Sequence, residues 1–345
     1  MKLTFVSYHA PLAEGSAAGR QLFAVGTALE GLGHTVECLA WQPNPPGDLP
    51  PWARWMPLRE RAGWRVRGRA LARPRSEVAT LGLHLSHDAI AIADEPFSYA
   101  ALAKHPQRAT GVFYCVDLDR KAQRDRSAAR LQDARAERRA VRGAHSVWTL
   151  SERVRAAVGR GTVVPATLPL PRSAVEFVEQ PVVGLLGDWS WAPNRLAADA
   201  LLKAWPSIRD RVPGATLLLA GRGSSPVGTL AGVSWLGELA YASDLLSQLA
   251  VFAFPCPDTS GPKIKTLDAL AHGVPVVTTP AGAEGVHTSA GLRTDDLVNG
   301  VVALLSDPQG RAAAAGQARQ AMERYHSPEV AALARVEVLR ATAAP

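Results

Sequence analysis

The chain has 345 residues, of which 47% are apolar and 20% are charged, and its net charge is +7. This length fits two domains of about 150 residues each, and the composition argues against a disordered chain. No uncharged apolar run approaches the ~20 residues of a membrane-spanning helix, and Met1–Gly15 is typical of a first buried strand rather than a signal peptide. The three cysteines stand far apart and without metal-ligand spacing, which favours buried thiols in a reducing cytoplasm.

Strand and helix signals alternate through the first half of the chain. Short apolar or β-branched runs predict strands at Leu3–Ser7, Thr35–Ala40, Ala89–Ala93, Thr110–Val116 and Ser146–Leu150. Periodic apolar or charged runs predict helices over Ala17–Leu32 and Arg126–Arg142, and Ser151 is placed to cap a further helix. Strands that alternate with helices indicate a parallel, doubly wound sheet.

A proline-rich connector follows. Four prolines between Pro165 and Pro181 disfavour both a helix and a central strand, so we expect a linker over 165–181 between a first domain over 1–164 and a second over 182–325. The last residues, 326–345, are predicted to form a helix that crosses back to the first domain. Residues 1–172 hold 25 Lys and Arg against 15 Asp and Glu, whereas the remainder holds 13 against 16, so the two halves are expected to meet different partners.

The second half repeats the α/β pattern. It predicts strands at Val182–Leu186, Ala215–Ala220, Val233–Leu236, Val251–Phe254 and Val274–Thr278. The predicted helices are Asn194–Arg211, Tyr241–Leu249, Pro262–His272, Asp295–Leu305, Arg311–Tyr325 and Pro328–Ala343. Two such sheets should bind a ligand in a cleft between the domains, at the carboxyl ends of their strands.

Lys263, Lys265 and Asp268 stand together at the start of the predicted helix Pro262–His272, directly after an apolar strand. Lysines at a helix N-terminus oppose the helix dipole by about 0.3–1 kcal/mol each, and a bound anion would reverse that sign. Asp268 lies on the same helix face as Lys265, where its carboxylate can accept hydrogen bonds from two vicinal ribose hydroxyls. The three residues therefore indicate a nucleoside diphosphate site; the alternative is a solvated ion pair on a surface helix.

The stretch Ser260–Val277 resembles the signature of retaining GT-B glycosyltransferases of the "group 1", family 4-like, type, which ends in A-x-A-x-G-x-P-V-V. Gly184–Leu202, which contains G-x-x-x-W-x-P-N, and Leu217–Gly223 are similar to two strand ends of the same family's donor domain. The resemblance is strong over 182–290 and weaker over 1–160. It implies two Rossmann-like α/β domains, with the acceptor in the first and the nucleotide sugar in the second.

The resemblance also implies roles for individual residues. Lys263 and Lys265 would act in catalysis by holding the donor diphosphate, and Asp268 would bind the ribose. Gly187 and Gly261 would let the backbone approach the nucleotide closely.

Three residues of the second half depart from the family's pattern. Asp268 stands where the family usually has glutamate, and Ser260 stands where many members have an acid that contacts the transferred sugar. Asp188 stands where many members have an arginine that neutralises phosphate. These departures place more of the diphosphate charge on the two lysines and leave the choice of sugar open.

The first domain offers a small-residue loop, Tyr8–Gln21, in which Gly15 and Ser16 would contact the donor as a glycine-rich loop does in the family. The alternative is a plain surface loop. Histidines in the first half lack metal-ligand spacing, and His9 is of interest because it ends the first strand at the cleft.

Ala93–Ser98 resembles the family's H-E-P stretch, with Asp94 in place of histidine, so Asp94 is a candidate catalytic residue that would accept a hydrogen bond from a sugar hydroxyl. A helix cap beside Pro96 is an equal alternative. Asp117 is a second strand-end carboxylate of the same kind.

Residues 51–75 carry eight arginines, from Arg54 to Arg75, interleaved with tryptophan. This pattern suits an anionic membrane surface or an anionic acceptor. Nucleic acid would also suit it, but no nucleic-acid-binding fold accompanies it. The alternative is that the arginines merely reflect a GC-rich genome.

The predicted function is transfer of a sugar from a nucleotide diphosphate donor, UDP- or GDP-linked, to an acceptor hydroxyl with retention at the anomeric carbon. The enzyme would be metal-independent, without a further cofactor, and cytoplasmic or peripheral at the inner face of the membrane. Such a reaction belongs to bacterial glycoconjugate, polysaccharide or natural-product biosynthesis. The alternatives are a catalytically inactive binding subunit of the same fold and a GT-B-fold nucleotide-sugar epimerase.

Overall fold

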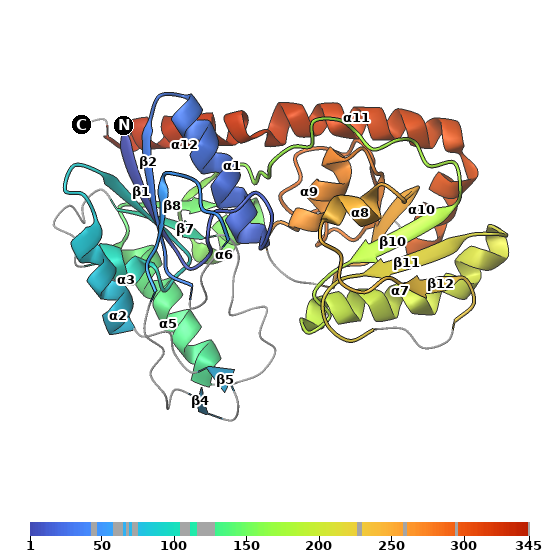
Figure 1. Ribbon diagram of the computed structural model, residues 1–345, viewed down its shortest axis with the longest axis horizontal. Helices are drawn as coiled ribbons and strands as arrows, with labels where there is room; N and C mark the ends of the chain where they lie inside the picture. Colours follow the sequence, from blue (N-terminus) through green and yellow to red (C-terminus); the bar gives the residue numbers. More distant parts are fainter. Residues whose placement is uncertain are drawn as a thin grey trace. The chain divides into compact units, whose positions relative to one another are not determined.

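The computed structural model describes residues 1–42, 47–57, 65–66, 69–70, 75–103, 111–115, 128–225, 230–257, 261–293 and 296–343. The chain divides into two compact units, one formed by Met1–Pro169 with Pro328–Pro345 and the other by Leu170–Ser327. Each unit has its own parallel sheet with helices packed on it (Figure 1). The two doubly wound sheets predicted from the alternating pattern are therefore confirmed.

In the first unit the described strands of the sheet follow the order β3-β2-β1-β6-β7-β8-β9, and all neighbours are parallel. These strands are β1 (Lys2–Ser7), β2 (Thr35–Ala40), β3 (Ala53–Trp55), β6 (Ile90–Asp94), β7 (Val112–Cys115), β8 (Ser146–Thr149) and β9 (Thr162–Val163). A separate antiparallel ribbon joins β4 (Arg65–Val66) and β5 (Arg69–Ala70). Because β2 and β6 flank β1 on opposite sides, the strand order reverses at β1, which opens a crevice at its carboxyl end.

The helices of the first unit include one from the far end of the sequence. They are α1 (Ala17–Gly31), α2 (Arg75–Thr80), the 3-10 helix η1 (Leu81–His84), α3 (Tyr99–Leu102), α5 (Ala128–Gly143), α6 (Glu152–Val158) and α12 (Pro328–Ala343). Helix α12 packs against α1, so the last residues of the chain complete the first unit (Figure 1). Ser151 accepts a hydrogen bond from the backbone N–H of Val154 at 3.1 Å, as predicted for a helix cap.

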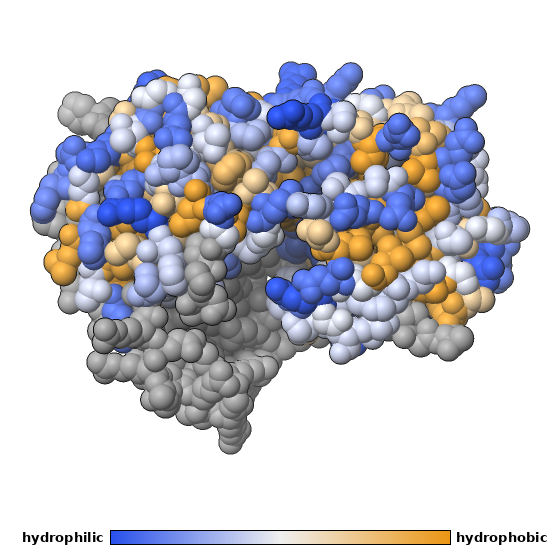
Figure 2. All heavy atoms as spheres, viewed as in Figure 1, coloured by the Kyte–Doolittle hydropathy of each residue, from blue (hydrophilic) through white to orange (hydrophobic). Residues whose placement is uncertain are grey.

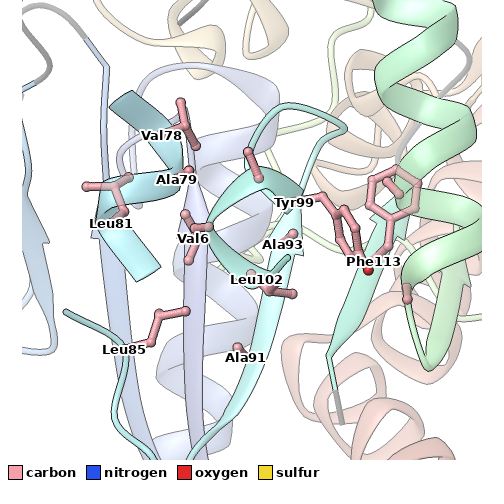
Figure 3. Packing of buried hydrophobic residues seen from close by; sticks show 14 of the residues in the cluster. Val6, Val78, Ala79, Leu81, Leu85, Ala91, Ala93, Tyr99, Leu102 and Phe113 are labelled. Atoms are coloured by element: carbon pink, nitrogen blue, oxygen red, sulfur yellow. The ribbon is translucent and has the colours of Figure 1, made fainter. Parts of the chain in front are cut away.

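The apolar core of the first unit lies between its sheet and helices α2, α3 and α5 (Figure 3). Val6, Ala93 and Phe113, from β1, β6 and β7, are fully buried, and the Phe113 ring packs edge-on against Tyr99. The parallel register pairs Val6 with Ala93. The next residues along these two strands therefore meet at the carboxyl edge of the sheet, beside the crevice.

The second unit has the described strand order β12-β11-β10-β13-β14-β15, again with parallel neighbours. Its strands are β10 (Val182–Leu186), β11 (Thr216–Ala220), β12 (Val233–Trp235), β13 (Val251–Phe254), β14 (Val276–Thr278) and β15 (Leu292–Arg293). Its helices are α7 (Ala192–Arg211), α8 (Ala242–Leu246), α9 (Ile264–Ala271), α10 (Leu297–Ser306) and α11 (Pro308–His326). The strand order reverses at β10, so the carboxyl end of β10 marks the ligand crevice of this unit.

One predicted boundary was wrong in a way that matters for the site. Pro262 was expected to be the first residue of its helix, but α9 begins at Ile264, with Lys263 in the N-cap position. Pro262 thus belongs to the preceding loop, because Lys263 has an extended backbone, with φ −99° and ψ 98°, as is typical of N-cap residues. Both lysines consequently stand within one residue of the helix start.

The surface mixes polar and apolar side chains over the face shown in Figure 2. Among the described residues no helix is both long and apolar enough to cross a membrane. Arg54 forms an ion pair with Glu37, but most of the arginine-rich stretch, and Asp117, lie outside the described residues, so the predicted membrane contact stays a prediction. Cys38 and Cys256 are both buried, as predicted for these two thiols.

Candidate functional site

The two lysines at the start of α9 are both bound to main-chain oxygens. The Nζ of Lys265 donates to the carbonyl of Leu186 at 2.9 Å and to Oδ1 of Asn194 at 2.6 Å. The Nζ of buried Lys263 donates to the carbonyl of Gly261. Because Leu186 is the last residue of β10, Lys265 ties the N-terminus of α9 to the carboxyl end of the central strand. The lysines thus lie at the topological switch point of the second unit.

The site concentrates positive charge. The pKa of Lys265 is lowered to about 7, mainly by burial and in part by the neighbouring Lys263, while Cys256 and Asp188 partly oppose the shift. The Lys265 ammonium also lies 4.6 Å from the centre of the Phe254 ring, an attractive cation–π geometry. Two ammonium groups that repel one another, beside the positive end of a helix dipole, form a site that an anion would stabilise.

Two glycines bring the first two strand ends of the unit together. A Cβ on Gly187 would lie 2.8 Å from Nδ2 of Asn194. A Cβ on Gly221 would lie 1.8 Å from the carbonyl oxygen of Gly187, and Gly221 has a φ of +134° that disfavours other residues. The loop after β10 therefore packs backbone to backbone against the loop after β11. Gly187 is thus packed closely between Asn194 and Gly221, and its N–H donates to the carbonyl of Ala220 at 3.1 Å.

A compensating charge faces Asp188 across these two loops. The Nη2 of Arg222 lies 2.6 Å from Oδ2 of Asp188, and Oδ1 accepts hydrogen bonds from the backbone N–H and hydroxyl of Ser190 at 3.0 and 2.5 Å. The Ser190 and Arg222 contacts lower the pKa of Asp188, so the carboxylate is charged at neutral pH. Arg222 thus places a basic group at the neighbouring strand end, beside the position where the family usually has one.

The loop before α9 is fixed by a residue that the sequence reading missed. Oε1 of the buried Glu284 accepts a hydrogen bond from the backbone N–H of Gly261 at 3.0 Å. Asp268, the predicted ribose ligand, is only 3% exposed, and one of its carboxylate oxygens lies 3.6 Å from Nδ1 of His272. Ser260 lies outside the described residues.

In the first unit the structure buries Asp94. Its side chain is 3% exposed, and Oδ2 accepts a hydrogen bond from the Ser7 hydroxyl at 2.9 Å. The pKa of Asp94 is raised to about 6 because burial disfavours the charged carboxylate. The hydrogen bond from Ser7 and the charge of Arg335 lower the pKa and so partly offset this effect. The next residue, Glu95, has a φ of +74°, a strained backbone for a residue other than glycine. The role of Asp94 as a direct sugar contact stays a prediction, and its carboxylate is held inside the unit.

Gly15 and Ser16 lie in the exposed loop that joins β1 to α1. Gly15 has a φ of +136°. Ser16 is the N-cap of α1, and its Oγ accepts a hydrogen bond from Gly19 N–H at 3.1 Å. The same Oγ lies 3.1 Å from Nδ1 of His9. Among the predicted residues, Lys265 contacts the carboxyl end of β10 and Asp94 contacts that of β1, through Leu186 and Ser7.

Asn194, Arg222 and Glu284 escaped the sequence analysis as site residues. Asn194 is the last letter of the recognised G-x-x-x-W-x-P-N pattern and Arg222 lies inside Leu217–Gly223, so both had a signal. Glu284 had none, because its partner lies 23 positions away on another loop. In the described part of the chain, no group of acidic, histidine and cysteine side chains could hold a metal ion.

Comparison with known proteins agrees with this geometry. Residues 180–318 match the family described as Glycosyl transferases group 1. A GDP-mannose-dependent monoacylated alpha-(1-6)-phosphatidylinositol monomannoside mannosyltransferase from Corynebacterium glutamicum is 35% identical over an alignment of 159 positions. The match covers 39% of this chain and 42% of that protein. The match therefore spans less than half the length of this curated relative. The family resemblance inferred from the three motifs is confirmed over residues 180–318.

Solved structures extend the likeness to the whole chain. The crystal structure of TarM gives a TM-score of 0.76 at 10% identity over 98% of both chains. Anabaena HepE, in complex with UDP and glucose, gives 0.69 at 15% identity over 99% of this chain and 100% of that one. The trehalose-6-phosphate synthase OtsA gives 0.69 at 10% identity over 99% of both chains. At such identities the likeness shows the fold, and the predicted GT-B fold class is confirmed.

Proposed function

We propose that this chain, whose residues 180–318 form a group 1 glycosyltransferase domain, transfers a sugar from a nucleotide diphosphate donor to an acceptor hydroxyl. The observation that carries the proposal is the contact of Lys265 with Leu186 and Asn194, at 2.9 and 2.6 Å. It places an ammonium group and the start of a helix at the strand end beside Gly187. This combination suits a diphosphate, whose oxygens would accept hydrogen bonds from the ammonium group and from the first N–H groups of α9.

The lysines would act on the leaving group. As the bond between the anomeric carbon and the diphosphate breaks, negative charge builds up on the phosphate oxygen. Lys263 and Lys265 would stabilise that charge, together with the first N–H groups of α9. Both ammonium groups are already oriented by main-chain carbonyls, so little reorganisation is required during the reaction. Asp268 would bind the ribose, and Gly261 would present its backbone beside the phosphates.

The donor is proposed to be UDP- or GDP-linked. The curated relative is described as dependent on GDP-mannose, and the HepE structure contains UDP and glucose. Both nucleotides share the diphosphate and ribose for which the second unit has candidate ligands. We further propose that transfer retains the anomeric configuration. We also propose that it needs no metal ion, because the residues at the α9 start supply the positive charge that a metal would otherwise bring.

A thermal-shift panel of UDP, GDP, ADP and TDP, each alone and as a nucleotide sugar, tests the donor site. A ligand at about 100 times its dissociation constant adds about 2.7 kcal/mol to the free energy of unfolding, so one nucleotide should raise the melting temperature clearly. If none does so, the proposed donor site is wrong.

A turnover measurement with the best donor then separates the enzyme from its alternatives. Transfer to an acceptor is expected, and the anomeric configuration of the product, read by NMR, tests retention. Binding without turnover would point instead to an inactive binding subunit. Conversion of the donor to its epimer would point to an epimerase.

A further inference from the structure

We propose that Arg335, from the last helix of the chain, is a positioning residue of the first unit, and that its buried guanidinium group supplies the positive charge that balances the Asp94 carboxylate. Asp94 is the predicted contact for a sugar hydroxyl, so Arg335 acts on sugar transfer through Asp94. The inference rests on the proposed function. It makes α12 a part of the site as well as a part of the core.

A row of four buried side chains crosses the sheet near its carboxyl edge. Its members come from β1, β6, β7 and β8 and are Ser7, Asp94, Tyr114 and Trp148. The register pairs Asp94 with Tyr114 and Tyr114 with Trp148, and the Ser7 hydroxyl donates to Oδ2 of Asp94 at 2.9 Å. The residue that precedes each member belongs to the apolar core described above (Figure 3). Because side chains alternate between the two faces of a sheet, the row lies on the opposite face.

Arg335 reaches this row from α12 and is only 1% exposed. Its Nη2 donates to the Tyr114 hydroxyl at 2.8 Å, and its Nη1 donates to the carbonyls of Ala331 and Pro165 at 2.8 and 3.1 Å. The guanidinium carbon lies 5.2 Å from the centre of the Tyr114 ring and 5.9 Å from that of the Trp148 ring, within the range of a cation–π interaction. Neutral partners therefore hold the positive charge in place beside the residue that pairs with Asp94.

The groups that face Asp94 differ in their charge at neutral pH. They come from four elements and are Ser7 of β1, Cys38 of β2, Tyr114 of β7 and Arg335 of α12. Burial is the main cause that raises the pKa of the Cys38 thiol and of the Tyr114 phenol, so both are uncharged near pH 7. A buried carboxylate requires a compensating charge, and within this set of described residues Arg335 provides it.

The pH profile of sugar transfer tests this role. An ionised carboxylate accepts a hydroxyl hydrogen bond more strongly than a neutral carboxyl does, so kcat/KM should fall as the pH is lowered through the Asp94 pKa of about 6. In Arg335→Gln, where burial acts without the opposing charge, this fall should begin at a higher pH. Arg335→Lys keeps the charge and should stay closer to the wild type. Arg340→Gln, at an exposed arginine of the same helix, is the matched control and should leave the profile unchanged.

NMR of isotopically labelled aspartate carboxyls measures the same effect without a substrate. The Asp94 signal is identified by its absence from Asp94→Asn. Its titration midpoint should move to higher pH in Arg335→Gln and stay in place in Arg340→Gln. Tyr114→Phe removes a hydrogen-bond partner of Arg335 but no charge, and the carbonyls of Ala331 and Pro165 still hold the guanidinium group. The midpoint in Tyr114→Phe should therefore remain near that of the wild type.

A double-variant comparison covers the case in which Arg335→Gln folds poorly. At pH 8 the Asp94 carboxyl is ionised, since its pKa is about 6. Removal of this charge by Asp94→Asn should therefore change the melting temperature more favourably in Arg335→Gln than in the wild type. The same change in both backgrounds would show that the two charges are not coupled and would overturn the inference.

The outcomes separate this inference from the proposed function. If the wild type transfers no sugar from any donor, the proposed function fails, whereas the NMR titration and the melting temperatures still decide whether Arg335 balances Asp94. If the wild type is active, an unchanged pH profile in Arg335→Gln overturns the inference alone. An unmoved Asp94 midpoint in that variant overturns it in either case. Equal shifts in Arg335→Lys and Arg335→Gln would assign the effect to packing and also overturn it.

Discussion

Lys265 and Asn194 lie 71 positions apart, yet Nζ of the lysine donates to Oδ1 of the asparagine at 2.6 Å. Asn194 itself is buried and also donates to the carbonyl of Asp188 at 2.9 Å. One amide thus orients both the candidate phosphate ligand and the loop after β10.

Asn194→Ala should therefore weaken binding of the donor nucleotide about tenfold and lower the free energy of unfolding by about 1–3 kcal/mol, because it leaves buried polar groups without a partner. Calorimetric titration and urea unfolding measure the two effects. Asn299→Ala, at an exposed asparagine of the same unit, is the control and should change neither. Equal nucleotide affinity in Asn194→Ala would contradict the assigned role.

Donor binding should depend on pH through Lys265. Burial lowers the pKa of this lysine to about 7, and a bound diphosphate favours its protonated form. Below pH 7 the free protein already carries that proton, so the affinity for the nucleotide does not change with pH. Above pH 7 binding must take up a proton, and affinity should fall, by at most tenfold per pH unit.

A nucleotide sugar is the suitable probe for this pH series, since both of its phosphates are esterified and do not titrate in this range. Calorimetry between pH 6 and 9 measures the slope for the wild type. The Lys265→Met variant should bind the nucleotide sugar more weakly, with an affinity that does not depend on pH. The same slope in both proteins would assign the titration to another group.

Substitutions of the two members of the Asp188–Arg222 pair should have opposite effects on nucleotide binding. Arg222→Gln should weaken nucleotide binding, because a positive charge beside Gly187 is lost. Asp188→Asn should strengthen binding, because a negative charge is removed and Arg222 is released toward the phosphates. Arg222 is exposed and Asp188 half-buried, so each change should alter the free energy of unfolding by no more than about 1 kcal/mol. Affinity changes of the same sign in both variants would contradict this account.

Gly221 and Gly214 separate backbone strain from close packing. Both have positive φ, +134° and +87°, but only at Gly221 would a Cβ meet another atom, the Gly187 carbonyl oxygen. Gly214→Ala should therefore cost about 1 kcal/mol of stability and leave nucleotide affinity intact. Gly221→Ala should force the two loops apart and lose measurable affinity. Thermal unfolding and titration of the two variants give the comparison, and equal affinities would exclude a role for the loop contact.

The buried carboxyl of Asp94 should leave a pH signature in the stability of the protein. Its pKa rises to about 6 on folding from a usual value near 3.8, so between these values the folded state binds more protons than the unfolded state. The free energy of unfolding should fall as pH rises through this window, relative to Asp94→Asn. The exposed Asp88, whose pKa is lowered to about 2, should give the opposite slope in an Asp88→Asn comparison. Parallel curves for the wild type and Asp94→Asn would contradict the assignment.

The sequence was sufficient for the fold and for placing Lys263 and Lys265 at a helix start, since both depend on local signals. Apolar strands alternate with helical periods, and Lys263 and Lys265 stand at a recognisable helix start. It was insufficient for contacts made across loops. The pairing of Arg222 with Asp188 and of Glu284 with Gly261 depends on how neighbouring strand ends meet in space. Burial of Asp94 depends on the register of β1 and β6, which residue spacing alone does not determine.

The central claim is that Lys263 and Lys265 hold the diphosphate of a nucleotide donor. Isothermal titration of the nucleoside diphosphate that gives the largest thermal shift tests it directly, with the wild type, the Lys263→Met/Lys265→Met double variant and Lys203→Met as a surface control. The account predicts equal affinity for the wild type and the control, and at least a hundredfold weaker binding for the double variant. A double variant that unfolds at the wild-type temperature and binds the nucleotide with wild-type affinity would contradict it.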